Sequence, residues 1–204
     1  IPSATYRFLQ VANELYTVKG VDIVLRAFRM AFTASDDVSL CLKLGPKVGP
    51  WEVLQSQLEA LECSGQKHQL VLDRHPLDHA DMPLLYAQAD CGILPSRTET
   101  FGLRGLEAAY CGLQVLLHPC GGMADYAPWI DYKPTESHSK EMPANSWREN
   151  RSTTWFEPDS ASLAHQMRAA FELRTRSAQY AQRLAALFHP TAAWQTMSEA
   201  LKIG

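Results

Sequence analysis

The chain has 204 residues and a formal net charge of -3 at neutral pH, so it can bury one large α/β domain but carries no basic field for nucleic acid. Lysine and arginine form no cluster that would mark a membrane surface, and no apolar run approaches the eighteen or so residues that a membrane-spanning helix needs. The five cysteines have no metal-ligand spacing, which is typical of reduced thiols in a cytoplasmic protein.

The first part of the chain alternates strand patterns with helix patterns. A β-branched and aromatic run predicts a strand over 6–12, and apolar residues at helical spacing between Val24 and Phe32 predict the helix that follows it. Strands are expected again over 38–44 and 69–72, and helices over 51–61 and 81–89. Because strands that alternate with helices form parallel sheets covered on both faces, we expect a Rossmann-like α/β fold.

The central stretch, 89–109, delivers backbone amides to one point. A short apolar strand over Cys91–Leu94 leads into a polar turn, and a helix then begins near Gly102 and Leu103. The first turn of a helix has unpaired amides and the positive end of the helix dipole, so it suits a phosphate. Gly102 allows the backbone to approach such a ligand closely.

Two carboxylates with seven residues between them bracket this turn. Glu107 falls about one helical turn beyond Leu103, where a carboxylate can accept two hydrogen bonds from a vicinal diol such as ribose. Glu99 lies in the turn itself, closer to whatever is attached beyond the phosphates. Arg104 is a cation in the first turn of a helix, which the dipole disfavours unless an anion is bound nearby. Each charge alone also fits a solvated surface position, but the set favours an anion site.

The rest of the chain is expected to complete the sheet and then to become helical. A fifth strand is predicted over 114–118, just before Gly121 and Gly122, and a sixth over 130–132. The polar span 133–154 contains prolines and shows no sustained periodicity, so we expect an exposed loop there. The expected C-terminal helices of the region 159–204 cover 160–173, 177–188 and 191–201. The whole chain, 1–204, is then a single domain.

Ligands of open parallel sheets bind beyond the carboxyl ends of the strands. The segments that follow the predicted strands should therefore meet at one rim of the sheet. These segments contain Lys19, residues 73–78, residues 99–104, and the pair Gly121 and Gly122.

The stretch SRTETFGLRGLEAAYCGLQVL resembles the signature of the retaining GT-B glycosyltransferases of the E-x7-E type, the family 4-like or group 1 enzymes. The likeness extends, in register, to VKGVDIVLRAF, DMPLLYAQADCGILPSR and LLHPCGGMADY, and it covers about Tyr6 to Tyr126. It implies that the chain is the C-terminal, donor-binding half of a GT-B fold. The N-terminal acceptor-binding domain is then absent from this chain.

The resemblance also implies roles for individual residues. Glu107 would hold the ribose hydroxyls, Glu99 would contact the donor sugar near the reacting carbon, and Lys19 would neutralise phosphate charge as the nucleotide leaves. Further donor-binding positions are the pyrophosphate amides of Thr100, Phe101, Gly102 and Leu103, the side chain of Arg104, the base-reading loop at Arg74 and His75, and the double-glycine loop at Gly121 and Gly122.

One position departs from the family pattern. Many members carry an arginine five residues before the lysine, and this chain has Glu14 there. Either Arg104 or Lys43 replaces that phosphate cation, or the absent domain contributes one, or donor binding is weakened.

Histidines near the rim raise the question of a metal. His75 and His79 are four residues apart, but Pro76 interrupts any helix between them and no third ligand is at hand, so we expect no metal and no cofactor. His118 ends a predicted strand, where it could touch a substrate or be a satisfied strand-end histidine. In the last predicted helix, Trp194, Met197 and Leu201 recur at helical spacing, which fits either core packing or contact with the missing half.

Together these features predict a domain that binds a nucleotide-sugar donor and transfers the sugar, with retention, to a sugar or glycan acceptor. We expect a hexosyltransferase-type enzyme of the cytoplasm, which would reach the inner face of a membrane only through the absent domain. The isolated domain could be inactive. The alternatives are a GT-B epimerase or phosphorylase, which shares the scaffold, and a non-catalytic nucleotide-binding domain.

Overall fold

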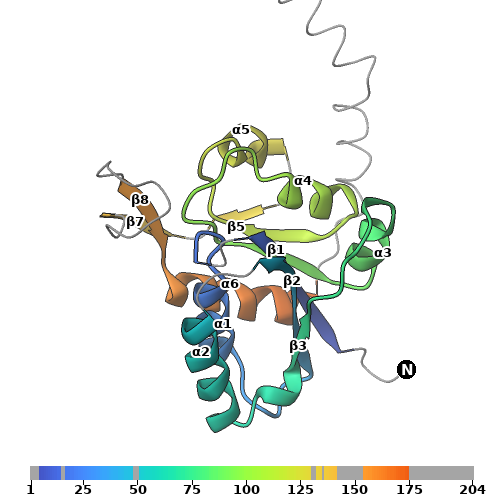
Figure 1. The fold of residues 1–204 in the computed structure, drawn as a ribbon, viewed down its shortest axis with the longest axis vertical. Coiled ribbons are helices and arrows are strands. Elements are labelled where there is room, and N and C mark those ends of the chain that lie inside the picture. The colour runs from blue at the N-terminus through green and yellow to red at the C-terminus, as the bar shows by residue number, and fades with distance from the viewer. Residues whose placement is uncertain are drawn as a thin grey trace, which may run out of the picture.

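The computed structural model describes residues 5–14, 17–47, 51–129, 132–134, 136–141 and 154–174. Its main sheet has six parallel strands in the order β3-β2-β1-β4-β5-β6 (Figure 1). This arrangement confirms the predicted Rossmann-like fold. The strands are β1 (Tyr6–Glu14), β2 (Val38–Lys47), β3 (Leu70–Asp73), β4 (Cys91–Leu94), β5 (Gln114–Leu117) and β6 (Tyr132–Pro134).

Helices cover both faces of this sheet (Figure 1). One face packs against α1, α2 and α6, and the other against α3, α4 and α5, which gives two separate apolar clusters. The helices are α1 (Val21–Ala31), α2 (Trp51–Cys63), α3 (Met82–Ala87), α4 (Leu103–Tyr110), α5 (Met123–Tyr126) and α6 (Ser160–Leu173). Among the described residues, none of these helices has the length and the apolar character to cross a membrane.

The side chains of β1 show why this sequence makes a central strand. Tyr6, Phe8 and Ala12 are buried in the cluster under α1 and α6, whereas Leu9 and Val11 are buried in the cluster under α3 and α4. Successive side chains of a strand point to opposite faces, and a parallel strand covered on both faces therefore reads as a nearly continuous apolar run.

The strand order changes direction between β1 and β4. From β1 the chain moves outward through β2 to β3, and it then returns to place β4 on the other side of β1. Such a switch point leaves a crevice beyond the carboxyl ends of the two central strands, because the connections on either side lead away from each other. The loops after β1 and β4 carry Lys19 and Glu99.

The prediction of an exposed loop over 133–154 was wrong over 133–134, over 137–141 and at Thr154, where the structure describes strands. Strand β6 extends to Pro134, and β7 (Ser137–Glu141) pairs antiparallel with β8 (Thr154–Pro158). The sequence of β7, SHSKE, has no apolar residue, so it has no hydrophobic period, and its strand is defined by backbone pairing with β8. Residues 142–153 lie outside the described residues.

The C-terminal helix prediction is confirmed where the structure describes the chain. Helix α6 spans Ser160–Leu173, as its apolar spacing predicted. The helices expected over 177–188 and 191–201, together with Trp194, Met197 and Leu201, lie outside the described residues.

Candidate functional site

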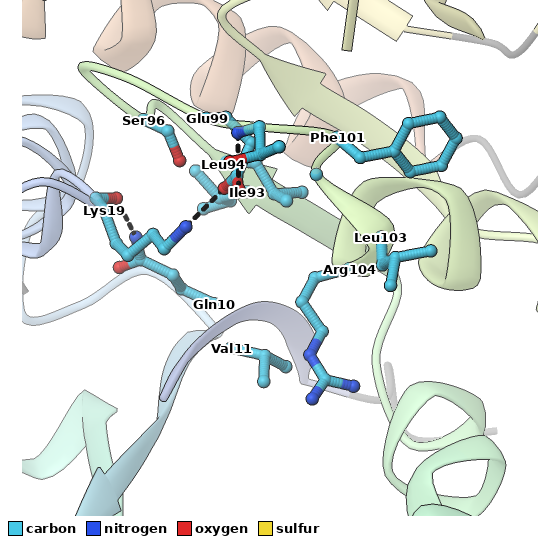
Figure 2. Close-up of a pocket in the computed structure, with 12 residues that line it drawn as sticks. Gln10, Val11, Lys19, Ile93, Leu94, Ser96, Glu99, Phe101, Leu103 and Arg104 are labelled. Carbon is cyan, nitrogen blue, oxygen red and sulfur yellow. Dashed lines mark hydrogen bonds and ion pairs between the residues drawn. The ribbon is translucent and has the colours of Figure 1, made fainter. Parts of the chain in front are cut away.

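A cavity of about 400 Å³ opens beyond the carboxyl ends of β1 and β4 (Figure 2). Its charged wall residues are Lys19, Glu99 and Arg104, so two cations and one anion face a single space. The remaining wall consists of strand ends and the turn before α4. The lining residues are Gln10, Val11, Lys19, Ile93, Leu94, Ser96, Glu99, Thr100, Phe101, Gly102, Leu103 and Arg104.

Helix α4 begins at the wall of this cavity. Its N-cap residue is Gly102, with φ +74°, and no side chain caps the first turn of the helix. A Cβ atom at this position would lie 2.2 Å from the Cγ atom of Met123, so both the left-handed conformation and the packing require glycine. The hydroxyl of Tyr126 donates a hydrogen bond to the Gly102 carbonyl at 2.6 Å. Because no side chain of the described residues caps this turn, its amides keep the partial positive charge that attracts an anion.

Lys19 and Glu99 meet across the cavity, although they are 80 residues apart in the sequence. The Nζ atom of Lys19 lies 2.5 Å from Oε2 of Glu99, and their side chains are 30% and 15% exposed. A dashed line marks this ion pair in Figure 2. The side-chain amide of Gln10 donates a hydrogen bond to the Lys19 carbonyl at 2.8 Å. This lysine and this carboxylate thus form an ion pair in the wall of the cavity.

Glu107 lines a second cavity, of about 270 Å³, rather than the first. Leu103 lines both cavities, so the two carboxylates of the E-x7-E spacing lie in neighbouring spaces. The hydroxyl of Tyr86 and the Nη1 atom of Arg104 each donate to Oε2 of Glu107 at 2.8 Å. Burial, and then the nearby Glu107, raise the pKa of Tyr86, which therefore remains a hydrogen-bond donor. Arg104 also lines the first cavity and links the two.

The double-glycine loop lies behind the turn that carries Glu99. Gly121 has φ +54°, and a Cβ atom there would lie 1.8 Å from the carbonyl oxygen of Glu99. The amide of Gly122 donates to the carbonyl of Thr100 at 2.8 Å. Neither glycine is among the residues that line the cavity, and the structure places this pair against the backbone of the turn that carries Glu99.

The predicted base-reading loop lies at the end of β3 and lines neither cavity. The Nζ atom of Lys43, which is buried, donates to Oδ2 of Asp73 at 2.9 Å and also to the carbonyl of His75. This hydrogen bond from Lys43 lowers the pKa of Asp73 to about 2. Lys43 therefore holds the loop that contains Arg74 and His75, and of the two cations considered as replacements, Lys43 and Arg104, it is Arg104 that lines the first cavity. The side chain of Glu14 lies outside the described part of the chain.

Cys120, which directly precedes Gly121, has a neutral thiol. Burial and, to a lesser extent, the charge of Glu99 raise the pKa of Cys120 to about 11. Its Sγ atom donates to the carbonyl of Ser96 at 3.4 Å. A thiol with such a pKa is a poor nucleophile at neutral pH, because only the thiolate attacks.

His118 is a satisfied strand-end histidine. Its Nδ1 atom lies 3.0 Å from the carbonyl oxygen of Ser96 and must donate to it, so Nε2 accepts from the hydroxyl of Ser137 at 2.9 Å. Burial lowers its pKa, which favours this neutral form. In the described part of the chain, no three His, Cys, Asp or Glu side chains are grouped so that they could hold a metal ion.

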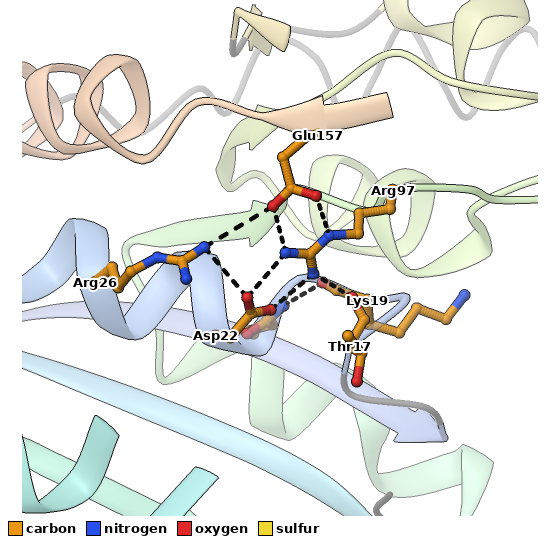
Figure 3. A network of polar contacts seen from close by, with 7 residues as sticks. Thr17, Lys19, Asp22, Arg26, Arg97 and Glu157 are labelled. Carbon is orange, nitrogen blue, oxygen red and sulfur yellow. Dashed lines mark hydrogen bonds and ion pairs between the residues drawn. The ribbon is translucent and has the colours of Figure 1, made fainter. Parts of the chain in front are cut away.

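A buried ion-pair network was not predicted from the sequence. Arg97 lies between Asp22 at the start of α1 and Glu157 in β8, with N to O distances of 2.5 to 2.8 Å (Figure 3). The available signal was Asp22, an acidic residue within the apolar run VDIVL, because a carboxylate in such a run needs a buried cation. No pattern in the sequence indicates which cation pairs with Asp22.

Comparisons with known proteins agree on the class of domain. The family model described as "Glycosyl transferases group 1" matches residues 2–128. A D-inositol 3-phosphate glycosyltransferase 1 of Catenulispora acidiphila is 32% identical over 118 residues, which are 56% of this chain and 28% of that protein. A D-inositol 3-phosphate glycosyltransferase of Pseudarthrobacter chlorophenolicus is 27% identical over 117 residues, 57% of this chain and 27% of that protein. The matches thus span less than a third of these relatives.

Solved structures share the fold at low sequence identity. The C-terminal domain of a glycosyl transferase group 1 family protein (LpcC) from Francisella tularensis has a TM-score of 0.64 and 16% identity, covering 90% of this chain and 86% of that one. Anabaena Alr3699/HepE in complex with UDP-glucose has a TM-score of 0.66 and 17% identity, covering 98% of this chain and 49% of that one. The fold therefore matches a domain that makes up about half of a larger chain.

Proposed function

The chain belongs to the group 1 glycosyl transferases, and from this membership we propose that it binds a nucleotide-sugar donor for a retaining glycosyltransferase. The acceptor, a sugar or glycan, would be bound mainly by a second domain that is not part of this chain. The size of the relatives supports this division, because the matched region is 28% of the Catenulispora acidiphila protein.

The observation that carries the proposal is the convergence of groups that bind anions at the first cavity, with Glu99 as the one anionic side chain among its lining residues. The uncapped N-terminus of α4, Lys19 and Arg104 all face one space at the switch point of the sheet. A diphosphate fits this field, since backbone amides and cations both stabilise its oxygens. The solved structure of Anabaena Alr3699/HepE with UDP-glucose supports a nucleotide sugar as the ligand class.

The same groups suit the chemical step. As the bond between sugar and phosphate breaks, negative charge grows on the departing phosphate oxygens. Fixed amide dipoles and Lys19 stabilise that charge where it develops, and their prior orientation makes them effective. Lys19 would exchange its ion pair with Glu99 for a pair with phosphate, and Glu99 would then be available to the sugar. Burial keeps the Cys120 thiol protonated, so this thiol is not the nucleophile, and we propose that the acceptor attacks on the face from which the nucleotide departs.

Glu107 would bind the ribose from the second cavity. The Tyr86 hydroxyl and Arg104 both bind Oε2 of this carboxylate, which fixes its orientation before a ligand arrives. Oriented carboxylate oxygens accept hydrogen bonds from the two hydroxyls of a diol. The apolar side chains of Met82 and Leu106 in the same cavity would contact the nucleoside.

Calorimetry with UDP, GDP and ADP tests the proposal on the chain as it exists. We expect one diphosphate to bind measurably, and Glu107→Gln to weaken its binding by about 1 to 3 kcal/mol, because ribose hydroxyls lose a charged acceptor. The matched control is Glu172→Gln, which changes an exposed carboxylate on α6 that pairs with Arg168. Failure of all three diphosphates to bind, or equal binding by the Glu107 variant and the wild type, would contradict the proposal.

A further inference from the structure

The Arg97 network lies behind the wall of the first cavity and is almost fully buried. The residues Arg97, Asp22 and Glu157 are 4%, 6% and 9% exposed. Arg97 binds both oxygens of Asp22 at 2.7 and 2.8 Å and both oxygens of Glu157 at 2.5 and 2.7 Å. Arg26 lies 3.2 Å from Asp22 and 3.9 Å from Glu157, so two cations balance two anions (Figure 3).

Arg97 also fastens together the two loops that line the cavity. Its backbone amide donates to the carbonyl of Val18 at 2.8 Å, and its guanidinium donates to the carbonyl of Thr17. Lys19 follows these two carbonyls directly, and Glu99 lies two residues after Arg97. One residue thus holds the loop before α1 against the loop after β4.

The packing of the two loops leaves little room for adjustment. A Cβ atom at Gly20 would lie 2.2 Å from the carbonyl oxygen of Pro95. The loops are therefore in direct backbone contact on one side of Lys19 and are joined by Arg97 on the other. A change in the bonds of Arg97 would alter the separation of Lys19 and Glu99, because Arg97 joins their two loops directly.

The β7–β8 hairpin also contacts Arg97. The amide of Phe156 donates to the carbonyl of Arg97 at 3.3 Å, and the next residue of β8 supplies the Glu157 carboxylate. Buried charges are stable only when they are fully paired, and loss of one partner leaves an uncompensated charge. The forked guanidinium can satisfy two carboxylates and a carbonyl at once, whereas a lysine ammonium has three donors on a single nitrogen.

We propose that Arg97 is a positioning residue for the donor site, which sets the placement of Lys19 and Glu99 by holding their two loops to Asp22 and Glu157. This inference rests on the proposed function of the cavity. It predicts that Arg97 affects diphosphate binding only through Lys19 and its partner, since Arg97 does not line the cavity itself.

The test is a double-mutant cycle with the diphosphate that binds best among UDP, GDP and ADP. Arg97→Lys keeps the charge but loses the fork, and we expect it to weaken binding about tenfold, within the range of coupling for residues in one network. In a Lys19→Ala background, the same Arg97→Lys change should alter the affinity by less than about twofold. If Arg97 only stabilised the fold, Arg97→Lys would lower the melting temperature, and its effect on the affinity would be the same in the wild-type and Lys19→Ala backgrounds.

Arg168→Lys is the matched control. Arg168 also pairs with two carboxylates, Asp36 at 2.7 Å and Glu172 at 3.0 Å, and it contacts neither loop. This variant should bind the diphosphate as the wild type does. Glu157→Gln is the second variant and serves if Arg97→Lys does not fold, as judged by circular dichroism. It should weaken binding in the same direction and also lose its effect in the Lys19→Ala background.

The outcomes separate the two proposals. If the wild type binds no diphosphate, the proposed function itself fails. If the wild type binds and Lys19→Ala weakens binding, the donor site stands. The positioning role of Arg97 is then overturned by a folded Arg97→Lys or Glu157→Gln variant with wild-type affinity, or by effects that simply add to that of Lys19→Ala.

Discussion

A single glycine shows how closely the backbone packs against the turn that carries Glu99. Gly121 has a positive φ, and the space for a Cβ atom is occupied by the carbonyl oxygen of Glu99 at 1.8 Å. A side chain here would have to displace the turn that carries a proposed catalytic carboxylate. The constraint is thus both conformational and steric.

Gly121→Ala should therefore lower the free energy of unfolding by more than backbone strain alone, which costs about 1 to 3 kcal/mol. Urea denaturation followed by circular dichroism measures this change. Gly65→Ala is the control, because Gly65 also has a positive φ of +74°, but its nearest foreign atom lies at 3.5 Å. Equal losses for the two variants would show that contact with Glu99 has no energetic consequence.

At the scale of elements, α6 connects the hairpin to the core of the domain. It begins two residues after Pro158 of β8, and its buried residues Leu163 and Met167 pack in the cluster that contains α1. Asp159 caps the helix, since its Oδ2 atom accepts from the amide of Ser162 at 2.7 Å. The cap fixes the place where the chain leaves the strand that supplies Glu157.

Asp159→Ala should destabilise the protein by about 1 kcal/mol, the usual cost of losing an N-cap side chain. Thermal or urea denaturation measures the loss. The matched variant is Asp78→Ala, because Asp78 occupies an N-cap position of a short 3₁₀ turn but makes no side-chain cap hydrogen bond. A loss for Asp78→Ala as large as that for Asp159→Ala would argue against a capping role.

At the scale of the whole molecule, His118 joins three parts of the fold. It follows β5, its ring donates to the Ser96 carbonyl in the loop after β4, and it accepts from Ser137 in β7. Its ring also packs against that of Phe156 in β8, with 5.2 Å between the ring centroids. Protonation would turn Nε2 into a donor and thereby alter the contact with the hairpin.

Stability should consequently fall as the pH drops through the ordinary histidine range. Burial lowers the pKa of His118 in the folded state, so the unfolded chain takes up the proton first and unfolding becomes more favourable below about pH 6.5. Uptake of one proton changes the free energy of unfolding by at most about 1.4 kcal/mol per pH unit. Above that range the contribution of His118 to stability is complete.

His118→Asn should remove this part of the pH dependence, even if it lowers stability at all pH values. Urea denaturation at about pH 7.5 and about pH 5.5, on either side of the ordinary histidine pKa, measures the difference. His165→Asn, at an exposed position of α6, is the control and should retain the wild-type dependence. A His118 variant with the same loss of stability on acidification as the wild type would refute this account.

The fold could be predicted because its signals are local. The apolar run of β1, the spacing in α6 and the strand Cys91–Leu94 each identify an element from its own residues. The hairpin could not be predicted in the same way, since β7 has no apolar face and depends on a partner strand that begins at Thr154. The hairpin exists because its two strands pair with each other, and the residues of β7 alone do not reveal that pairing.

The sequence alone predicted the order of strands and helices from β1 to β5 and the glycine at the mouth of α4, and it singled out Lys19, Glu99 and Arg104 as candidate site residues. The order and the glycine follow from patterns within a few residues, where hydrophobic period and helix polarity act, whereas the roles expected of Lys19 and Glu99 are what the resemblance to GT-B glycosyltransferases implies. Only the tertiary structure decided that Glu107 faces a neighbouring cavity, that Lys43 is buried against Asp73, and that Arg97 joins Asp22 and Glu157, 75 and 60 residues away. The reason is physical: a buried charge selects its partner by proximity in the folded chain, and the distance along the sequence does not specify it.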